Sequence, residues 1–220
     1  MKIDFVSDIA CPWCAVGLNS LEMALKNIGT DIPTELQFHP YELNPTMAPE
    51  GADSAEYLRA KYGMSAEQLA QGRANLHARG AAVGFNFGER TRVWNTFDAH
   101  RLLYWAGLQS AEQQRQLKHA FLKAYHGEGR NPADQSLMLD LAVAAGLERD
   151  QAQDVISSQR YADEVRAEEQ FWQQAGIQSV PSIIINNKHL ITGGQTPDVF
   201  EQVLRDIAAQ ATEKSTQQAS

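Results

Sequence analysis

The sequence is poor in cysteine, in positive charge and in long apolar runs, and each shortage excludes a class of protein. Its 220 residues contain only two cysteines, too few for a disulfide-rich scaffold or for a zinc site made of four cysteines. Lysine and arginine number 19 against 27 aspartates and glutamates, and no basic run exceeds two residues. A net charge of −8 without a basic patch argues against nucleic acid or an anionic membrane surface as a partner.

The sequence also shows no segment of the kind that crosses a membrane. Its longest apolar run, around residues 183–185, is far too short to span a bilayer. Asp4 and Asp8 interrupt the N-terminal stretch, so the apolar core of a signal peptide does not form there. We therefore expect a cytoplasmic protein without a membrane partner. Standing disulfides are rare in that compartment, where a cysteine pair is more often catalytic than architectural.

The two cysteines stand in the motif Cys11-Pro12-Trp13-Cys14, where a strand gives way to a helix. Residues 3–6 have the composition of a strand, and apolar residues at helical spacing from Pro12 up to Gly29 predict the helix. Cys11 then lies at the N-cap, Pro12 at the first helical position and Cys14 one turn inside. The positive end of a helix dipole favours a thiolate, and a cysteine there has a pKa of about 3.5–7.5 instead of about 8.5.

This placement favours a redox centre over two alternatives. Sulfurs one helical turn apart can bond to each other, so the pair can cycle between dithiol and disulfide. Half of a zinc site is one alternative, but no second cysteine pair exists and none of the six histidines stands in a spaced pair. A purely structural disulfide is the other, but so small a loop would constrain the unfolded chain little. We expect no bound metal.

The middle of the chain predicts helices within an α/β framework. Residues 34–39 alternate as a second strand, which a helical crossover would pair in parallel with the first. The pattern is then helical to about Tyr161, with no convincing strand. Hydrophobic residues make up 43% of the chain, enough for a substantial core.

The sheet resumes near the C-terminus. Residues 182–185 and 189–192 predict a hairpin, because the asparagines between them tolerate the positive φ of a tight turn. Thr196 then caps a last helix, and the polar tail from residue 211 is expected to be disordered.

Several stretches resemble known families. Residues 7–14, with the cysteine motif, and residues 176–182, with Val180-Pro181, resemble the thioredoxin superfamily in its DsbA-like form. The finer resemblance is to its FrnE branch, which includes 2-hydroxychromene-2-carboxylate isomerases and kappa-class glutathione transferases. It is carried by Tyr41-Glu42-Leu43-Asn44-Pro45, Asn95-Thr96-Phe97-Asp98-Ala99-His100-Arg101-Leu102 and Ile191-Thr192-Gly193-Gly194-Gln195.

The resemblance implies an α/β thioredoxin-like fold with a large all-helical insertion. Its parts would be a first thioredoxin-like segment (1–43), the helical insertion (44–160), a second thioredoxin-like segment (161–210) and the tail (211–220). It also implies that the Val180–Pro181 bond is cis and lies opposite the cysteines. The backbone of Val180 would then be free to pair with an extended substrate.

One departure within the branch bears on function. The isomerases and transferases resembled here carry a serine where this chain has Cys11, and they lack the second cysteine. A serine hydroxyl can only donate a hydrogen bond to a glutathione thiolate, whereas the Cys11 thiolate can attack oxidised glutathione, form a mixed disulfide and release one glutathione thiolate. Retention of both sulfurs therefore indicates thiol–disulfide exchange.

We therefore expect a thiol–disulfide oxidoreductase that acts on protein thiols and disulfides or on glutathione, with no tightly bound cofactor and with glutathione as a candidate co-substrate. Cys11 would attack, Cys14 would resolve the mixed disulfide, and Pro12 and Trp13 would tune the potential. Val180 and Pro181 would hold substrate. The alternatives are a glutathione-dependent isomerase or transferase, and a holdase-like protein that binds unfolded chains.

Other residues are weaker candidates. The backbone N–H groups of Gly194, Gln195 and Thr196, at the start of the last helix, are a further position for a glutathione carboxylate. His39 is expected to be a packed or hydrogen-bonded histidine and not a catalytic base. Some of the aromatic residues of the helical stretch are expected to line a cleft against the sheet: Phe85, Phe87, Trp94, Phe97, Tyr104 and Trp105.

Overall fold

The computed structural model describes residues 1–218, and its centre is a four-stranded sheet in the order β2-β1-β5-β6. Strands β1 (Lys2–Ser7) and β2 (Glu35–Pro40) pair in parallel, as the sequence predicts. Strand β5 (Ser182–Ile185) pairs antiparallel with both β1 and β6 (His189–Thr192). The sheet is therefore assembled from both ends of the chain.

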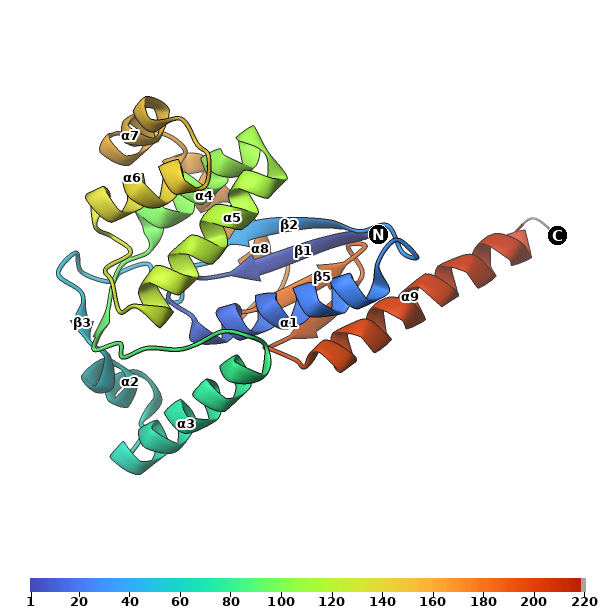
Figure 1. The fold of residues 1–220 in the computed structure, drawn as a ribbon, viewed down its shortest axis with the longest axis horizontal. Coiled ribbons are helices and arrows are strands. Elements are labelled where there is room, and N and C mark those ends of the chain that lie inside the picture. The colour runs from blue at the N-terminus through green and yellow to red at the C-terminus, as the bar shows by residue number, and fades with distance from the viewer. Residues whose placement is uncertain (219–220) are drawn as a thin grey trace.

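Helices cover both faces of this sheet. Helix α1 (Pro12–Ile28) crosses over between β1 and β2 and packs beside α9 (Pro197–Gln218), while α8 (Ala162–Gln174) lies on the opposite face (Figure 1). Ile3 and Phe5 of β1 are fully buried against Leu18 of α1 and Phe200 of α9. Because β1 is central and covered, the loop that follows it begins at a fixed place, the end of a buried strand.

The predicted hairpin is confirmed, and its turn uses two asparagines. Asn186 and Asn187 have φ values of 53° and 54° between β5 and β6. Successive left-handed residues make the turn whose twist matches that of paired strands. Asparagine tolerates this conformation better than most residues, and here the Asn186 side-chain oxygen accepts a hydrogen bond from the Lys2 N–H of β1 at 3.0 Å.

Between the two halves of the sheet lies a helical block, residues 44–160, which has an apolar cluster of its own. The expected division of the chain at residues 43 and 160 stays a prediction. The helical elements of the block are α2 (Ser54–Tyr62), α3 (Ala66–Ala82), α4 (Phe97–Gln109), α5 (Ala111–Leu122), the π-helical turn η1 (Lys123–Gly127), α6 (Gln135–Ala144) and α7 (Arg149–Ser157).

Two sequence predictions are wrong here. The block does contain strands, since β3 (Ala52–Asp53) pairs antiparallel with β4 (Arg92–Val93). Strands of two residues are too short to show an alternating pattern.

Helix α9 continues to Gln218, where we expected disorder from residue 211; residues 219–220 lie outside the described part. The tail to that point contains no glycine or proline to end the helix.

Within residues 1–218, no helix combines the length and the apolar character needed to cross a membrane.

Candidate functional site

Cys11 lies at the N-cap of α1, as predicted, directly after the loop that leaves β1. Its N–H donates to the carbonyl oxygen of Asp8 at 3.2 Å, and the N–H of Cys14 donates to the Cys11 carbonyl oxygen at 3.1 Å. Pro12 occupies the first helical position, where its missing N–H leaves nothing unpaired. Both cysteines are reduced; the side chain of Cys14 is fully buried, whereas Cys11 keeps a small exposed surface.

The two thiols differ in acidity. A hydrogen bond from the Cys14 thiol lowers the pKa of Cys11, because it stabilises the Cys11 thiolate. Burial raises the pKa of Cys14 well above its ordinary value, because a second thiolate there would be unsolvated. Cys11 is therefore the thiol that ionises first, and Cys14 holds its proton until a later step.

The strand β5 side of the site presents the backbone of Val180 to Cys11. The Cys11 thiol donates to the Val180 carbonyl oxygen at 3.4 Å, and the peptide bond between Val180 and Pro181 is cis. Gly17 of α1 makes this approach possible. A Cβ atom at position 17 would lie 2.9 Å from Pro181 Cγ and 3.4 Å from Gly194 Cα.

The three residues suggested for a glutathione carboxylate lie differently from one another. Gly194 lies against the cysteine motif, since a Cβ there would be 3.1 Å from the Trp13 carbonyl oxygen. Its own carbonyl oxygen accepts a hydrogen bond from Arg79 at 2.7 Å. Gln195 donates to the Thr192 carbonyl oxygen, and the Thr196 hydroxyl oxygen accepts from the N–H of Val199 at 3.4 Å. All of these bonds are local, apart from that of Arg79.

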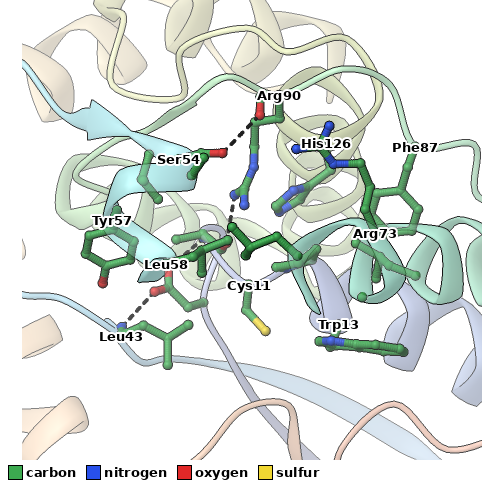
Figure 2. A pocket seen from close by; sticks show the side chains of 18 of the residues that line it. Cys11, Trp13, Leu43, Ser54, Tyr57, Leu58, Arg73, Phe87, Arg90 and His126 are labelled. Carbon is green, nitrogen blue, oxygen red and sulfur yellow. Dashed lines mark hydrogen bonds between the residues drawn. The ribbon is translucent and has the colours of Figure 1, made fainter. Parts of the chain in front are cut away.

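On its other side Cys11 borders a cleft of about 680 Å³ between α1 and the helical block. Figure 2 shows Cys11 near the centre, with Tyr57 of α2 to one side and Phe87 to the other. The lining is mostly apolar and aromatic, and it includes Trp13, Leu43, Met47, Leu58, Tyr62, Leu76, Val93 and Trp94. This volume is in the usual range for a small-molecule site.

Two arginines line the cleft, together with the carboxylates of Asp8 and Glu89. Arg90 (Figure 2) donates from Nη1 to the Ala10 carbonyl oxygen at 3.2 Å. Its guanidinium packs over the Tyr125 ring. No carboxylate of the described residues forms an ion pair with Arg90 or with Arg73, which also lines the cleft. An anionic group next to Cys11 would therefore find two cations available.

Asp8, three residues before Cys11, links the cysteine loop to the helical block. Its Oδ1 accepts from the Thr96 hydroxyl at 2.8 Å and lies 3.2 Å from His100 Nε2, while Oδ2 accepts from the N–H of Leu43 at 2.7 Å. Burial by itself would raise the pKa of Asp8, but the hydrogen bond and charge of His100 hold it below the usual value. Asp8 is thus a buried, ionised carboxylate beside the cysteines.

The π-helical turn η1 places a further side chain in the site. His126 donates from Nε2 to the Ile9 carbonyl oxygen at 2.8 Å and lines the cleft (Figure 2). Burial and the charge of Arg90 lower its pKa to about 3, so the ring is neutral near pH 7. Extra residues in a π-helical turn often mark a functional position.

The weaker sequence candidates divide in two groups. His39 is hydrogen-bonded, as expected: its Nε2 lies 2.7 Å from Asp4 Oδ1 and its Nδ1 lies 2.6 Å from Glu168 Oε1. Of the aromatic residues proposed for a cleft, Phe87 and Trp94 line it. The sequence did not identify Asp8, His100 or His126 as site residues, because no local pattern relates positions so far apart in the chain.

The fold and the site together define a thioredoxin-like protein with a paired-cysteine motif at a helix N-terminus. The chain belongs to the DSBA-like thioredoxin domain family, which matches residues 2–205.

Three solved structures of similar fold are compared with this chain. A probable DsbA oxidoreductase from Streptomyces coelicolor is 35% identical, with a TM-score of 0.87 over 94% of this chain and 89% of that one. A 2-hydroxychromene-2-carboxylate isomerase is 16% identical, with a TM-score of 0.70 over 97% and 98%. The cytosolic disulfide reductase DsbM from Pseudomonas aeruginosa, solved with glutathione, is 17% identical, with a TM-score of 0.65 over 95% and 100%. The first supports the family, and the other two show the fold.

Proposed function

We propose that this protein is a cytoplasmic thiol–disulfide oxidoreductase in which Cys11 attacks a substrate disulfide and Cys14 resolves the product. The observation that carries this proposal is the unequal pair of thiols. Cys11 borders the cleft and has a lowered pKa, whereas Cys14 is buried behind it with a raised pKa. Thiol–disulfide exchange needs one accessible thiolate and one held in reserve.

The reaction proceeds in two exchanges. The Cys11 thiolate attacks one sulfur of a substrate disulfide, forms a mixed disulfide and releases the other sulfur as a thiolate. Cys14 then loses its proton and attacks Cys11 Sγ, which forms the Cys11–Cys14 bond and releases the second substrate sulfur as a thiolate. Two electrons pass from the protein to the substrate. The reverse sequence would oxidise a substrate dithiol.

The two sides of Cys11 suit different parts of a substrate. The Val180 backbone can pair with an extended segment by strand addition. The cleft, with apolar walls and the unpaired cations Arg73 and Arg90, suits a small anionic thiol or disulfide such as glutathione. We infer that glutathione, or a small compound of similar charge, serves as substrate or co-substrate.

The size of the cleft favours a second candidate, a glutathione-dependent isomerase or transferase. A site of about 680 Å³ could hold a small aromatic compound beside a thiol. Against it stands Cys11 itself, whose thiolate would form a disulfide with bound oxidised glutathione.

Trapping of the mixed disulfide tests the proposal. Cys14→Ser should accumulate a glutathione adduct on Cys11 when treated with oxidised glutathione, because the resolving thiol is gone. Cys11→Ser, the matched control, should accumulate none, since the remaining thiol is buried and holds its proton. Intact-protein mass spectrometry reads both. Equal adducts on the two variants would contradict the division of roles, and glutathione conjugation unaffected by either change would favour the second candidate.

A further inference from the structure

His126 is a side chain of the cleft that the mechanism above does not use. It is 2% exposed on η1, where its ring stacks on Tyr125 with the centroids 4.7 Å apart and meets the Phe87 ring edge-on at 6.1 Å. Figure 2 shows His126 between Arg90 and Phe87, in the same cleft as Cys11. Two rings and one hydrogen bond hold the imidazole, so its orientation is fixed before a ligand binds.

The hydrogen bond of His126 decides which ring nitrogen carries the proton. Nε2 lies 2.8 Å from the Ile9 carbonyl oxygen, and a carbonyl oxygen can only accept, so Nε2 is the protonated nitrogen. Burial and the charge of Arg90 lower the pKa of His126 to about 3, against the opposing effects of the Ile9 hydrogen bond and the Asp8 charge. The ring therefore carries this one proton near pH 7, and Nδ1 keeps a lone pair that can accept a hydrogen bond.

Nδ1 of His126 opens on the cleft. No residue of the described part of the chain donates a hydrogen bond to it. Nδ1 is also not among the side-chain atoms of these residues that are sealed from solvent without a partner, so it keeps some accessible surface. The opening that His126 lines is the cleft. A ligand in the cleft that brings a donor can therefore pair with Nδ1.

The two carboxylates that line the cleft do not offer the same kind of acceptor. Both oxygens of Asp8 already accept hydrogen bonds, Oδ1 from Thr96 and Oδ2 from Leu43. Glu89 is exposed, so water solvates its carboxylate. His126 Nδ1 is neutral and lies among aromatic rings, and in such an environment a hydrogen bond is stronger than in water.

We propose that His126 is a specificity-determining residue of the first exchange: its Nδ1 accepts a hydrogen bond from an N–H group of the bound disulfide. The anionic group of the same substrate lies at Arg73 or Arg90, which pair with no carboxylate of the described residues. The preferred class is a small anionic disulfide with an amide N–H near the sulfur, because a disulfide without that N–H leaves Nδ1 unpaired. No proton passes to His126. This inference rests on the proposed function, since it concerns the substrate that Cys11 attacks.

A neutral acceptor makes the selectivity independent of pH. The absolute rate rises with pH as the Cys11 thiol ionises, but this ionisation acts equally on every disulfide. The ratio between two substrates should therefore stay constant between about pH 6 and 9, because His126 stays neutral over that range.

Two disulfides that differ in one group test this: N,N′-diacetylcystine and its analogue with both amide N–H groups methylated. Both carry the same carboxylates and carbonyls. Cys14→Ser retains each as a mixed disulfide on Cys11, so intact-protein mass spectrometry gives the half-saturating concentration and the maximal rate of the first exchange. We expect the N–H compound to half-saturate at an about tenfold lower concentration, with little change in the maximal rate.

Substitutions in the Cys14→Ser background assign this preference to His126. His126→Phe should reduce it to less than about twofold. His126→Gln should retain part of it, because a glutamine amide can donate to the Ile9 carbonyl oxygen and accept from the ligand. His189→Phe, the same change on β6 and outside the cleft, is the control and should keep the full preference.

A second measurement needs no substitution at His126. In the two adducts, nitrogen NMR of histidine-labelled protein should show a hydrogen-bonded Nδ1 with the N–H compound and a free Nδ1 with the methylated one.

Equal half-saturating concentrations in Cys14→Ser, the same Nδ1 signal in both adducts, or a preference that persists in a folded His126→Phe would each overturn this inference alone. Failure of both compounds and of oxidised glutathione to form any adduct on Cys11 would overturn the proposed function instead.

Discussion

The thioredoxin-like part of the chain supplies both sulfur atoms of the site, whereas the helical block supplies most of the side chains that set their environment. Cys11 and Cys14 come from one turn of α1, next to the strand β1 that precedes them. Thr96 is the N-cap of α4, His100 lies on α4 and Lys118 lies on α5, all of them 80 or more residues away in the chain. The spacing of the two sulfurs is thus set by neighbouring residues, whereas the charged and polar groups around them come from residues distant in the chain.

This difference follows from what each task requires. Two sulfurs must be close enough to bond, and one helical turn achieves that within four residues. Adjustment of a pKa needs only a charge of the right sign nearby, and that charge can come from any element that packs against the site. The helical block can therefore change the chemistry of the cysteines without altering the motif.

The largest stability effect is expected where the two parts are joined, at Asp8. Asp8→Asn should lower the free energy of unfolding by about 2–4 kcal/mol, because it removes a buried charge facing His100 and sets an amide N–H₂ against the donors of Thr96 and Leu43. Urea unfolding at pH 7 measures this. Asp140→Asn, at an exposed position on α6, is the control and should change the stability by less than about 0.5 kcal/mol.

Asp8→Asn should also change how the free energy of unfolding depends on pH in the acid range. The pKa of Asp8 in the folded state is below its ordinary value of 3.8, so its contribution is complete above pH 3.8 and is lost as the pH falls through the folded pKa. Asp8→Asn should therefore flatten the acid limb of stability against pH. An acid limb as steep in Asp8→Asn as in the unaltered protein would show that Asp8 is not the ionised link between the two parts.

Substitution of two glycines by alanine, one in each part of the chain, should have smaller effects on stability. At Gly17, an added Cβ would lie 2.9 Å from Pro181 Cγ. At Gly80, it would lie 2.5 Å from the Phe87 ring and 2.6 Å from the Phe85 carbonyl oxygen. Each Gly→Ala change should destabilise the protein by about 1–3 kcal/mol, with the larger loss at Gly80, where backbone is in the way.

The two changes should differ in function. Gly17→Ala disturbs the side that faces Cys11 and should alter the rate of Cys11 alkylation by iodoacetamide. Gly80→Ala displaces Phe87, which lines the cleft, and should weaken glutathione binding with little change in alkylation. Gly72→Ala on α3 is the control for stability alone, since Gly72 also lines the cleft: only Met64 Cε comes within 4 Å of a Cβ there, and alanine should stabilise that helix by about 0.5–1 kcal/mol. Indistinguishable effects of Gly17→Ala and Gly80→Ala on alkylation and binding would contradict the division between the two sides.

The smallest effect concerns Glu42, a buried carboxyl that pairs with Arg166 of α8. Burial raises its pKa from 4.5 to about 6, so the folded state binds this proton more tightly than the unfolded state. Its contribution to stability therefore falls as the pH rises from 4.5 to 6 and is constant above. Glu42→Gln should remove this dependence and raise the free energy of unfolding at pH 7 by about 1 kcal/mol.

Urea midpoints at pH 4.5 and pH 7 test the Glu42 prediction, with the exposed Glu50→Gln as control. A loss of stability at pH 7 in Glu42→Gln would show that the ion pair with Arg166 outweighs the burial of the charge.

The sequence by itself determined the elements whose signals are local. The placement of Cys11 at the N-cap of α1 follows from an apolar strand, a proline and a helical repeat within 30 residues. The turn of the C-terminal hairpin follows from two adjacent asparagines. The two-stranded β3–β4 pair escaped prediction because two residues carry no period.

Only the tertiary structure decided how the cysteines are surrounded. Lysine is almost never fully buried, so the pattern of α5 gave no reason to expect Lys118 in the interior. Asp8 and His100 are 92 residues apart, and their contact exists only because α4 packs against the loop that follows β1. The cleft likewise forms between α1 and segments of the helical block that approach it through the packing of the whole chain. Local propensity fixes where a side chain lies on its own element, whereas burial and charge depend on which other element covers it.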